Sequence, residues 1–280
     1  MQCDIVIPAY NSPSALPLAL AALKAQLVPP SWRVKIVMPA GGLNPTPASA
    51  RNQALGKSDG DIILFLGADI ILRPGALAQH LEFHQINPNP KLGALGMVKW
   101  DPRLAGTPFM EWMVHGGPQN DFDSVIGQSH ADPAHFFYGS HLSLKRSEIG
   151  DLKFESFGVY GWEDLGLGRR LAQQGFTLTP LPDAVGLHHH FYPLSRIRQR
   201  QRAVGESILR YQKVHSTAAI LPRRSRLRQL VRAIFISAGG QAALHALLLF
   251  TSPRLSTPRL FQLYTANEFW RGVWKSRFSP

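Results

Sequence analysis

Three acidic side chains lie where a carboxylate could take part in chemistry. Asp69 follows the apolar run 61–66, and a carboxylate just beyond a buried strand can hold a divalent cation against a diphosphate. Glu163 and Asp164 are adjacent at the start of a helical pattern, where one of them can act as a general base toward a hydroxyl nucleophile. Capping of a turn or of a helix N-terminus is the alternative role for each acid.

Three consecutive histidines form a candidate metal-binding segment at the end of an expected strand. Alternate residues of a strand share one face, so His188 and His190 could converge on a single ion while His189 points away. A polar loop without a metal is the alternative.

Two polar segments are candidates for contacting a phosphorylated ligand. The first is the turn that ends the first apolar run, and it consists of Pro8, Ala9, Tyr10 and Asn11. The second is Arg51 with Asn52 on an expected helix. An arginine can bind a diphosphate through paired hydrogen bonds, and a surface salt bridge is its ordinary alternative.

The hydrophobic pattern predicts the elements that must position these residues. Apolar runs predict strands at 4–9, 34–38, 61–66 and 92–99, and helical periods predict helices at 13–26, 48–55 and 76–85. Alternating strands and helices, with apolar runs that are continuous, predict a mostly parallel sheet covered by helices on both faces. Ligands bind such sheets beyond the carboxyl ends of the strands, where 8–11, 38–42 and 67–69 lie.

The rest of the chain is less regular. Residues 101–160 are rich in glycine, proline, histidine and aromatic residues, a helical pattern resumes at 161–174, and 176–181 is expected to be a strand leading to 185–190. We therefore expect one α/β domain in two halves, 1–100 and 101–194, followed by a basic helical extension, 195–280.

Charge is distributed unevenly. The chain of 280 residues has a net charge of +12, but residues 195–280 hold 16 Lys and Arg against two acids, while residues 1–194 hold 14 against 16. A nearly neutral body therefore carries a basic extension, which is typical of a surface that meets polyanions. A hydrophobic content of 45% excludes global disorder, and the single cysteine, Cys3, excludes an internal disulfide.

Order and spacing make the motifs more specific than each is alone. The segments DIVIPAYN, ARNQALGKSDGDIILFLGADIILRPGAL, FFYGSHLSLKRSEI, GWEDLGLGRRLAQQGFTL and AVGLHHH follow one another within residues 4–190. In this order the chain resembles the family 2 glycosyltransferases, which have the GT-A fold. The resemblance implies transfer of a sugar from a nucleotide-diphosphate sugar to an acceptor hydroxyl, with inversion at the anomeric carbon.

The same resemblance implies a role for each motif. The nucleotide-sugar pocket would be lined by Pro8, Ala9, Tyr10, Asn11, Arg51, Asn52 and Ala68. Asp69 and His188, with His190 on the same face, would hold Mn²⁺ or Mg²⁺, and nitrogen ligands favour Mn²⁺. Asp164 would be the catalytic base, with Glu163 as the second choice. Gly161 and Trp162 would lie on the acceptor side, although Trp162 could instead anchor the start of the helix.

Two departures from the family pattern are the basis of an alternative function. Gly67 replaces the first acid of the Asp-x-Asp motif, and the segment 38–42 lacks the acid that usually follows the second strand. Recognition of uridine is therefore not implied, and a catalytically degenerate nucleotide-sugar-binding protein is the alternative function.

The basic extension predicts a membrane surface as a partner. The apolar segment 230–250 approaches the length of a membrane span, but Arg232 and His245 would be costly in hydrocarbon. An interfacial helix on anionic lipid fits better, and a helical subdomain packed on the catalytic body is the alternative. Because no secretory signal is visible, we expect a cytoplasmic protein, peripheral on the inner face of the membrane. A carbohydrate, a lipid-linked glycan or a protein would be the acceptor, and no nucleic-acid partner is expected.

Overall fold

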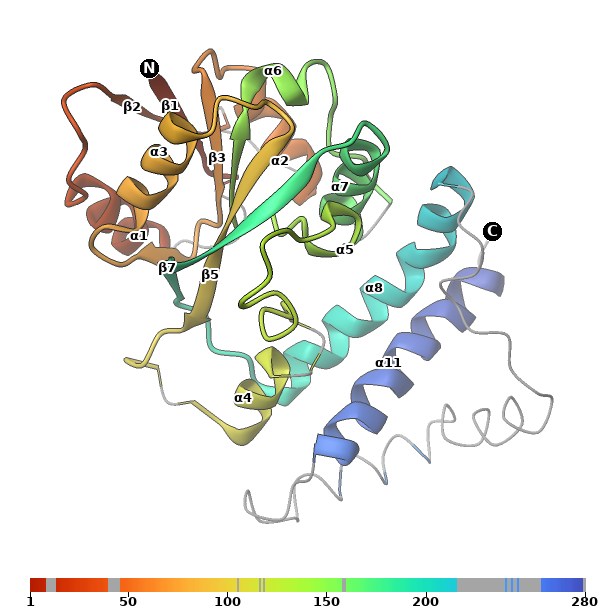
Figure 1. Ribbon diagram of the computed structural model, residues 1–280. Helices are drawn as coiled ribbons and strands as arrows, with labels where there is room; N and C mark the ends of the chain where they lie inside the picture. Colours follow the sequence, from red (N-terminus) through yellow and green to blue (C-terminus); the bar gives the residue numbers. More distant parts are fainter. Residues whose placement is uncertain are drawn as a thin grey trace. The chain divides into compact units, whose positions relative to one another are not determined.

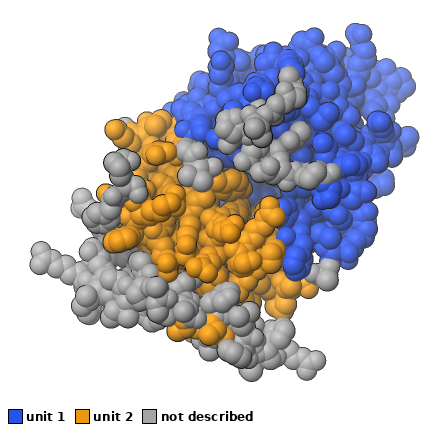
Figure 2. All heavy atoms as spheres, turned by 180° about the vertical axis from the view of Figure 1, so that it is seen from behind, with its two compact units in different colours: residues 1–105, 120–156, 163–191 blue, residues 106–119, 157–162, 192–280 orange. Residues whose placement is uncertain are grey.

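A computed structural model describes the chain at residues 1–8, 14–39, 46–104, 106–115, 117, 119–157, 160–215, 240, 243, 246 and 258–278 (Figure 1). The chain divides into two compact units, which Figure 2 colours separately. Unit 1 contains Met1–Ala105, Asn120–Ser156 and Glu163–Phe191. Unit 2 contains Gly106–Gln119, Phe157–Trp162 and Tyr192–Pro280.

Unit 1 is built on a sheet that has seven strands within the described residues. They are β1 (Gln2–Val6), β2 (Arg33–Val37), β3 (Ile62–Leu66), β4 (Ile70–Leu72), β5 (Leu92–Trp100), β6 (His141–Lys145) and β7 (Thr177–His188). The strand order is β2-β1-β3-β6-β5-β7-β4, and only β6 and β4 run against the direction of the others. The predicted α/β fold with a mostly parallel sheet is therefore confirmed.

Helices cover both faces of this sheet. The described helices of unit 1 are α1 (Leu16–Lys24), α2 (Pro47–Leu55), α3 (Ala76–Ile86), α5 (Pro133–Phe136), α6 (Arg146–Ile149) and α7 (Glu163–Gln173). In Figure 1, α1 and α3 lie on one side of the sheet, and α2, α5 and α7 on the other. The side chain of Gln26, just after α1, accepts a hydrogen bond from the Leu77 amide of α3 at 3.3 Å. The helix α2 starts at Pro47 because the Thr46 hydroxyl caps it by accepting from the Ser49 amide at 3.1 Å.

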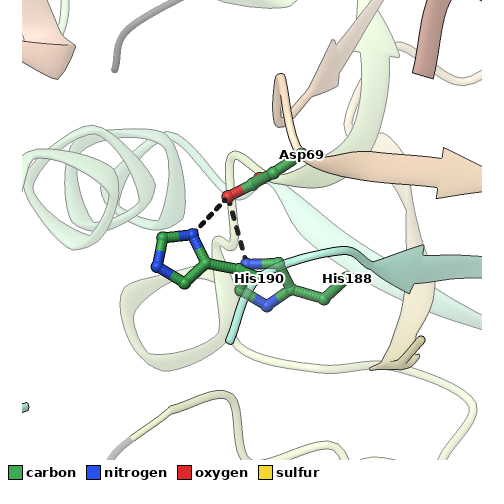
Figure 3. Close-up of side chains that lie close together, drawn as sticks. All are labelled: Asp69, His188 and His190. Atoms are coloured by element: carbon green, nitrogen blue, oxygen red, sulfur yellow. Dashed lines mark hydrogen bonds and ion pairs between the residues drawn. The ribbon is translucent and has the colours of Figure 1, made fainter. Parts of the chain in front are cut away.

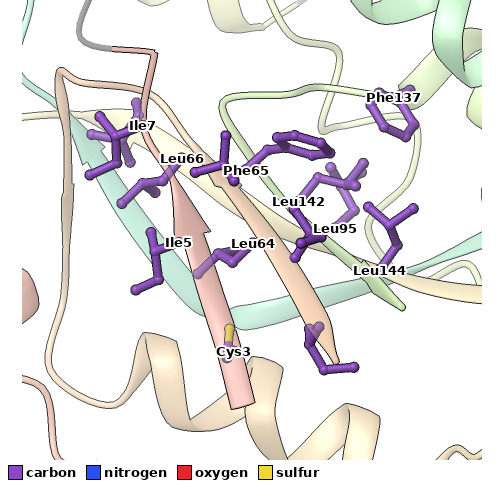
Figure 4. Close-up of a cluster of buried hydrophobic side chains, with 14 of the residues drawn as sticks. Cys3, Ile5, Ile7, Leu64, Phe65, Leu66, Leu95, Phe137, Leu142 and Leu144 are labelled. Atoms are coloured by element: carbon purple, nitrogen blue, oxygen red, sulfur yellow. The ribbon is translucent and has the colours of Figure 1, made fainter. Parts of the chain in front are cut away.

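The core is formed by the apolar strands and the side chains that face them (Figure 4). All five residues of β3 are buried, as expected for a strand covered on both faces. Phe65 of this strand packs edge-on against Phe154, with 5.1 Å between ring centroids. Burying one such side chain stabilises the fold by roughly 2 kcal/mol relative to exposing it. The sheet is therefore a rigid support for the residues at its edge.

The sequence pattern did not reveal β4 and β6. The strand β4 has three residues, too few to show a period, and it forms by antiparallel pairing with β7. The strand β6 contains two buried polar residues, His141 and Ser143, which interrupt the apolar run. Segments 176–181 and 185–190, expected as successive extended segments, belong largely to the single strand β7, whose pairing with β5 shifts register between Gly96 and Met97.

A buried network of histidines underlies β6. His80 contacts both the Ser143 hydroxyl at 2.8 Å through Nδ1 and His141 at 3.1 Å through Nε2. His84 contacts the same hydroxyl at 2.8 Å. Burial lowers the pKa of His141 to about 4 and that of His84 to about 3, so both are neutral at physiological pH.

Unit 2 is built around two long helices, α8 (Leu194–His215) and α11 (Pro258–Phe278), and also contains the short helix α4 (Pro108–Val114). Phe157, Ile208, Tyr211 and Val273 form its described apolar cluster. Among the helices that the structure describes, none is long and apolar enough to cross a bilayer. The apolar segment 230–250 lies outside the described residues except at Gly240, Ala243 and Ala246.

Candidate active site

The pairing of β4 with β7 determines the position of Asp69. Asp69 lies in the turn between β3 and β4, where the Ile70 amide donates to the Gly67 carbonyl at 3.1 Å. Ile70 then pairs with His188 in the antiparallel register of β4 and β7. The His189 amide donates to the Asp69 carbonyl at 2.8 Å and extends this pairing by one step. The start of β4 therefore meets the carboxyl end of β7.

Asp69, His188 and His190 converge at this point (Figure 3). Asp69 Oδ2 lies 3.2 Å from His188 Nε2 and 3.5 Å from His190 Nδ1. The potential ligand atoms all lie within 4.8 Å of one another. The expectation that His188 and His190 share a face therefore agrees with this geometry, and one oxygen and two nitrogens form a donor set suited to a divalent transition metal.

Electrostatics keep the carboxylate of Asp69 ionised. Burial alone would raise the pKa of Asp69, but hydrogen bonds and charge interactions with His188 and His190 outweigh burial and hold it well below its usual range. A carboxylate that stays ionised is available as a metal ligand.

Asp101 and His189 form a second contact on the other side of the strand end. His189 Nδ1 lies 2.7 Å from Asp101 Oδ2, and the Asp101 carboxylate is fully buried. The same carboxylate binds Arg103 through Nε and Nη2. Because His189 is fixed to Asp101, the flanking residues His188 and His190 are directed toward Asp69. His188 also stacks on Trp100, with 5.0 Å between ring centroids.

The acids at the start of α7 are paired with a buried arginine. Arg51 Nη1 lies 3.0 Å from Asp164 Oδ1 and 3.5 Å from Glu163 Oε1. The Arg51 side chain is 10% exposed and also lies over the Phe154 ring, 5.2 Å from its centroid. Of the two acids, Asp164 is the more exposed, at 26% against 11% for Glu163. Asp164 is therefore the acid that an incoming group can reach more easily.

Burial raises the pKa of Asp164, although Arg51 and a hydrogen bond from the Gly139 amide oppose this shift. Two carboxylates share one guanidinium here, so the cation cannot fully compensate both. A carboxylate with a raised pKa is a stronger base, which suits proton removal from a hydroxyl group.

Gly139 and Ser140 connect the two parts of the site. The Gly139 amide donates to Asp164 Oδ2 at 3.1 Å, and the Ser140 carbonyl accepts from the Gly67 amide at 2.9 Å. A Cβ at position 139 would lie 3.0 Å from Asp164 Oδ1, so a side chain there would crowd the carboxylate. The motif FFYGSHLSLKRSEI contains this segment, but no residue type in it predicts the contact with Asp164, because a backbone donor leaves no mark on residue type.

The remaining predicted nucleotide-binding residues are only partly described. Ala9, Tyr10 and Asn11 lie outside the described residues. Pro8 and Ala68 are buried. The Asn52 side chain donates to the Phe154 carbonyl and accepts from its amide, both at 2.8 Å, so this side chain binds backbone. Nucleotide binding by these residues stays a prediction.

Gly161 and Trp162 belong to unit 2. Trp162 has a positive φ of 72°, an unusual conformation for a bulky residue. Its Nε1 donates to the Val204 carbonyl at 2.9 Å, and its ring lies 5.2 Å from that of Tyr211. These contacts agree with the alternative of a helix anchor, and the acceptor role stays a prediction.

The known proteins that this chain is similar to are glycosyltransferases. No family model matches the chain. In sequence it is similar to the uncharacterized glycosyltransferase YfnE of Bacillus subtilis (strain 168), at 24% identity over 67% of this chain and 64% of that protein. The chain thus spans less than two thirds of that relative's length.

Solved structures show the same likeness. The mannosyltransferase PcManGT from Pyrobaculum calidifontis, solved with GDP-Man and Mn²⁺, has a TM-score of 0.60 at 16% identity and covers 99% of this chain and 87% of its own. Residues 1–349 of S. aureus TarS, solved with UDP, give 0.50 at 14% identity over 96% of this chain and 90% of that one. The chain has the glycosyltransferase fold. The match to a GT-A-like architecture agrees with the fold class expected from the motifs.

Proposed function

We propose that the chain is an inverting glycosyltransferase, similar to family 2, which moves a sugar from a nucleoside-diphosphate sugar to an acceptor hydroxyl. The observation that carries the proposal is the convergence of Asp69, His188 and His190 at strand ends, joined through Gly139 and Ser140 to the carboxylate of Asp164. The structural neighbours bind GDP-Man in one case and UDP in the other, which supports a nucleoside diphosphate donor and leaves its base open.

Asp69, His188 and His190 would hold a divalent metal. Their mixed oxygen and nitrogen donors fit Mn²⁺ better than Mg²⁺, which prefers oxygen ligands alone. When bound, the ion would supply positive charge against the negative charge that develops on the departing diphosphate. The neighbour solved with Mn²⁺ supports this cofactor. Gly67, which replaces the first acid of the motif, leaves Asp69 as the carboxylate of this turn.

Asp164 would take the proton of the acceptor hydroxyl as the hydroxyl oxygen attacks the anomeric carbon. Its raised pKa and its greater exposure than Glu163 suit this role. Arg51 and the Gly139 amide would hold the carboxylate in one orientation. Attack opposite the leaving diphosphate in a single displacement inverts the configuration. Glu163, the less exposed acid, would be the second choice for the base.

A carbohydrate, a lipid-linked glycan or a protein would be the acceptor, contacted by residues of 101–160 and by Gly161 and Trp162. An acceptor of polysaccharide biosynthesis at an anionic membrane surface would fit the basic residues of 195–280. Exposed Leu263 and Trp274 on α11, at 60% and 61%, support contact with a lipid interface.

Assays of donor use test the proposal. The full chain would be incubated with Mn²⁺ and a panel that includes GDP-mannose and UDP-N-acetylglucosamine, and release of nucleoside diphosphate would be measured. We expect turnover that Asp164→Asn abolishes while donor binding, followed by thermal shift, is retained. Asp183→Asn, at an exposed position, is the matched control and should leave turnover unchanged.

Two outcomes would change the conclusion. Undiminished turnover by Asp164→Asn would remove Asp164 as the base. Donor binding by the parent chain without any turnover would favour the alternative function, a nucleotide-sugar-binding protein that has lost catalysis.

A further inference from the structure

The two long helices of unit 2 gather three arginines around one acid. Arg198 and Arg202 are four residues apart on α8, and Glu268 and Arg271 are three apart on α11, so each pair lies on one helix face. The Glu268 carboxylate is fully buried and lies 3.0 Å from Arg198 Nε. Arg202 Nε contacts its second oxygen.

Charge in this arginine cluster is not balanced within the described residues. Three guanidinium groups stand against one carboxylate. Arg202 Nη2 and Arg271 Nη1 are buried and have no hydrogen-bond partner among the residues that the structure describes. Burial and the charges of Arg202 and Arg198 lower the pKa of Arg271, against the attraction of Glu268. Buried charged donors normally have an acceptor, so among the described residues the cluster has fewer anionic than cationic groups.

The two helices pack closely beside the cluster. A Cβ at Gly272 would lie 2.1 Å from the Arg202 carbonyl oxygen, and one at Gly205 would lie 1.9 Å from that of Phe269. The helices are therefore in direct backbone contact beside the cluster. Part of the cluster reaches solvent, because the Arg198 and Arg202 side chains are 39% and 32% exposed.

We propose that Arg198, Arg202 and Arg271 bind a phosphate group. Guanidinium groups donate paired hydrogen bonds to phosphate oxygens, and a phosphate offers acceptors to several arginines at once. The Glu268 carboxylate contacts Arg198 and Arg202, and its single negative charge cannot neutralise three guanidinium groups. The phosphate would come from inorganic phosphate in solution or from the headgroup of an anionic lipid. The three arginines belong to unit 2, whereas the proposed catalytic residues belong to unit 1, and the phosphate site does not depend on the proposed transfer reaction.

Thermal unfolding of the full chain tests the site with inorganic phosphate as the probe. We expect a saturable rise in unfolding temperature with phosphate, absent with chloride at equal ionic strength. Arg271→Met should weaken phosphate binding by about tenfold or more. Arg277→Met, an exposed arginine on the same helix, is the matched control and should retain binding. In buffer without phosphate, Arg271→Met should be as stable as the parent or more stable, because it removes repulsion. A purely structural ion pair predicts a loss of stability.

Vesicles distinguish the two sources of phosphate. Sedimentation would compare phosphatidylcholine vesicles with and without phosphatidic acid. Binding that requires phosphatidic acid and Arg271 supports the lipid headgroup, whereas a response to phosphate alone supports the free anion. If Arg271→Met does not fold, Arg202→Gln replaces it. The absence of a phosphate-specific effect in the parent, or an equal effect in the parent and the variant, overturns the proposal.

Discussion

Replacing Arg51 with methionine tests the link between the acids of α7 and the body of unit 1. The guanidinium lies 3.0 Å from Asp164 and 3.5 Å from Glu163, and all three side chains are largely buried. At an effective dielectric constant of about 20, each contact is worth roughly 5 kcal/mol before desolvation. Removing one partner of a buried ion pair costs about 3–5 kcal/mol. We expect Arg51→Met to lower the free energy of unfolding by about 3 kcal/mol near neutral pH.

The loss should depend on pH in a defined direction. Without Arg51, the pKa of Asp164 rises further, so the folded state binds a proton that the unfolded state has released. Folding of the variant is then favoured as pH falls, and its deficit relative to the parent should shrink between about pH 8 and about pH 5.5.

Urea unfolding followed by circular dichroism at both pH values measures this deficit. Arg33→Met, at an exposed position of β2, is the matched control and should change the free energy of unfolding by less than about 0.5 kcal/mol. A deficit for Arg51→Met below about 1 kcal/mol, or one that does not change with pH, would refute the assignment of a buried ion pair.

Three further predictions follow from the described contacts. Asp101→Asn should weaken Mn²⁺ affinity about tenfold to hundredfold, because His189 loses its buried partner. Titrations followed by electron paramagnetic resonance measure this affinity, and equal affinity in the variant and the parent would contradict the role of that contact. Protonation of His141 should lower the free energy of unfolding of the parent by roughly 2 kcal/mol between about pH 6.5 and about pH 4.5, because its folded pKa of about 4 lies below the unfolded value. A free energy of unfolding that does not change over this range in urea would contradict a buried neutral histidine. Gly272→Ala should cost about 1–3 kcal/mol in thermal unfolding because its Cβ would meet the Arg202 carbonyl, whereas Gln262→Ala on the exposed face should be neutral.

Much of the fold could be predicted because its elements are encoded locally. The runs at 61–66 and 92–99 are mostly apolar, and a strand buried on two faces needs such a run. The order of strands and helices predicted the sheet edge at which Asp69 lies. The resemblance to family 2 glycosyltransferases implied that His188 joins Asp69 in one metal site. The sequence also distinguished the basic extension, 195–280, from the rest of the chain, because its excess of Lys and Arg can be counted directly.

Only the tertiary structure decided which partner each of these residues has. Asp69 and His188 are 119 residues apart, and they meet because β4, too short to predict, pairs antiparallel with β7. Arg51, expected to reach a diphosphate, lies against Asp164 because α2 and α7 share one side of the sheet. Residue type fixes what a side chain can bind, whereas the distance to a partner depends on strand register and helix packing across the whole domain. The sequence by itself therefore identified the reactive side chains, and the fold determined which of them contact one another.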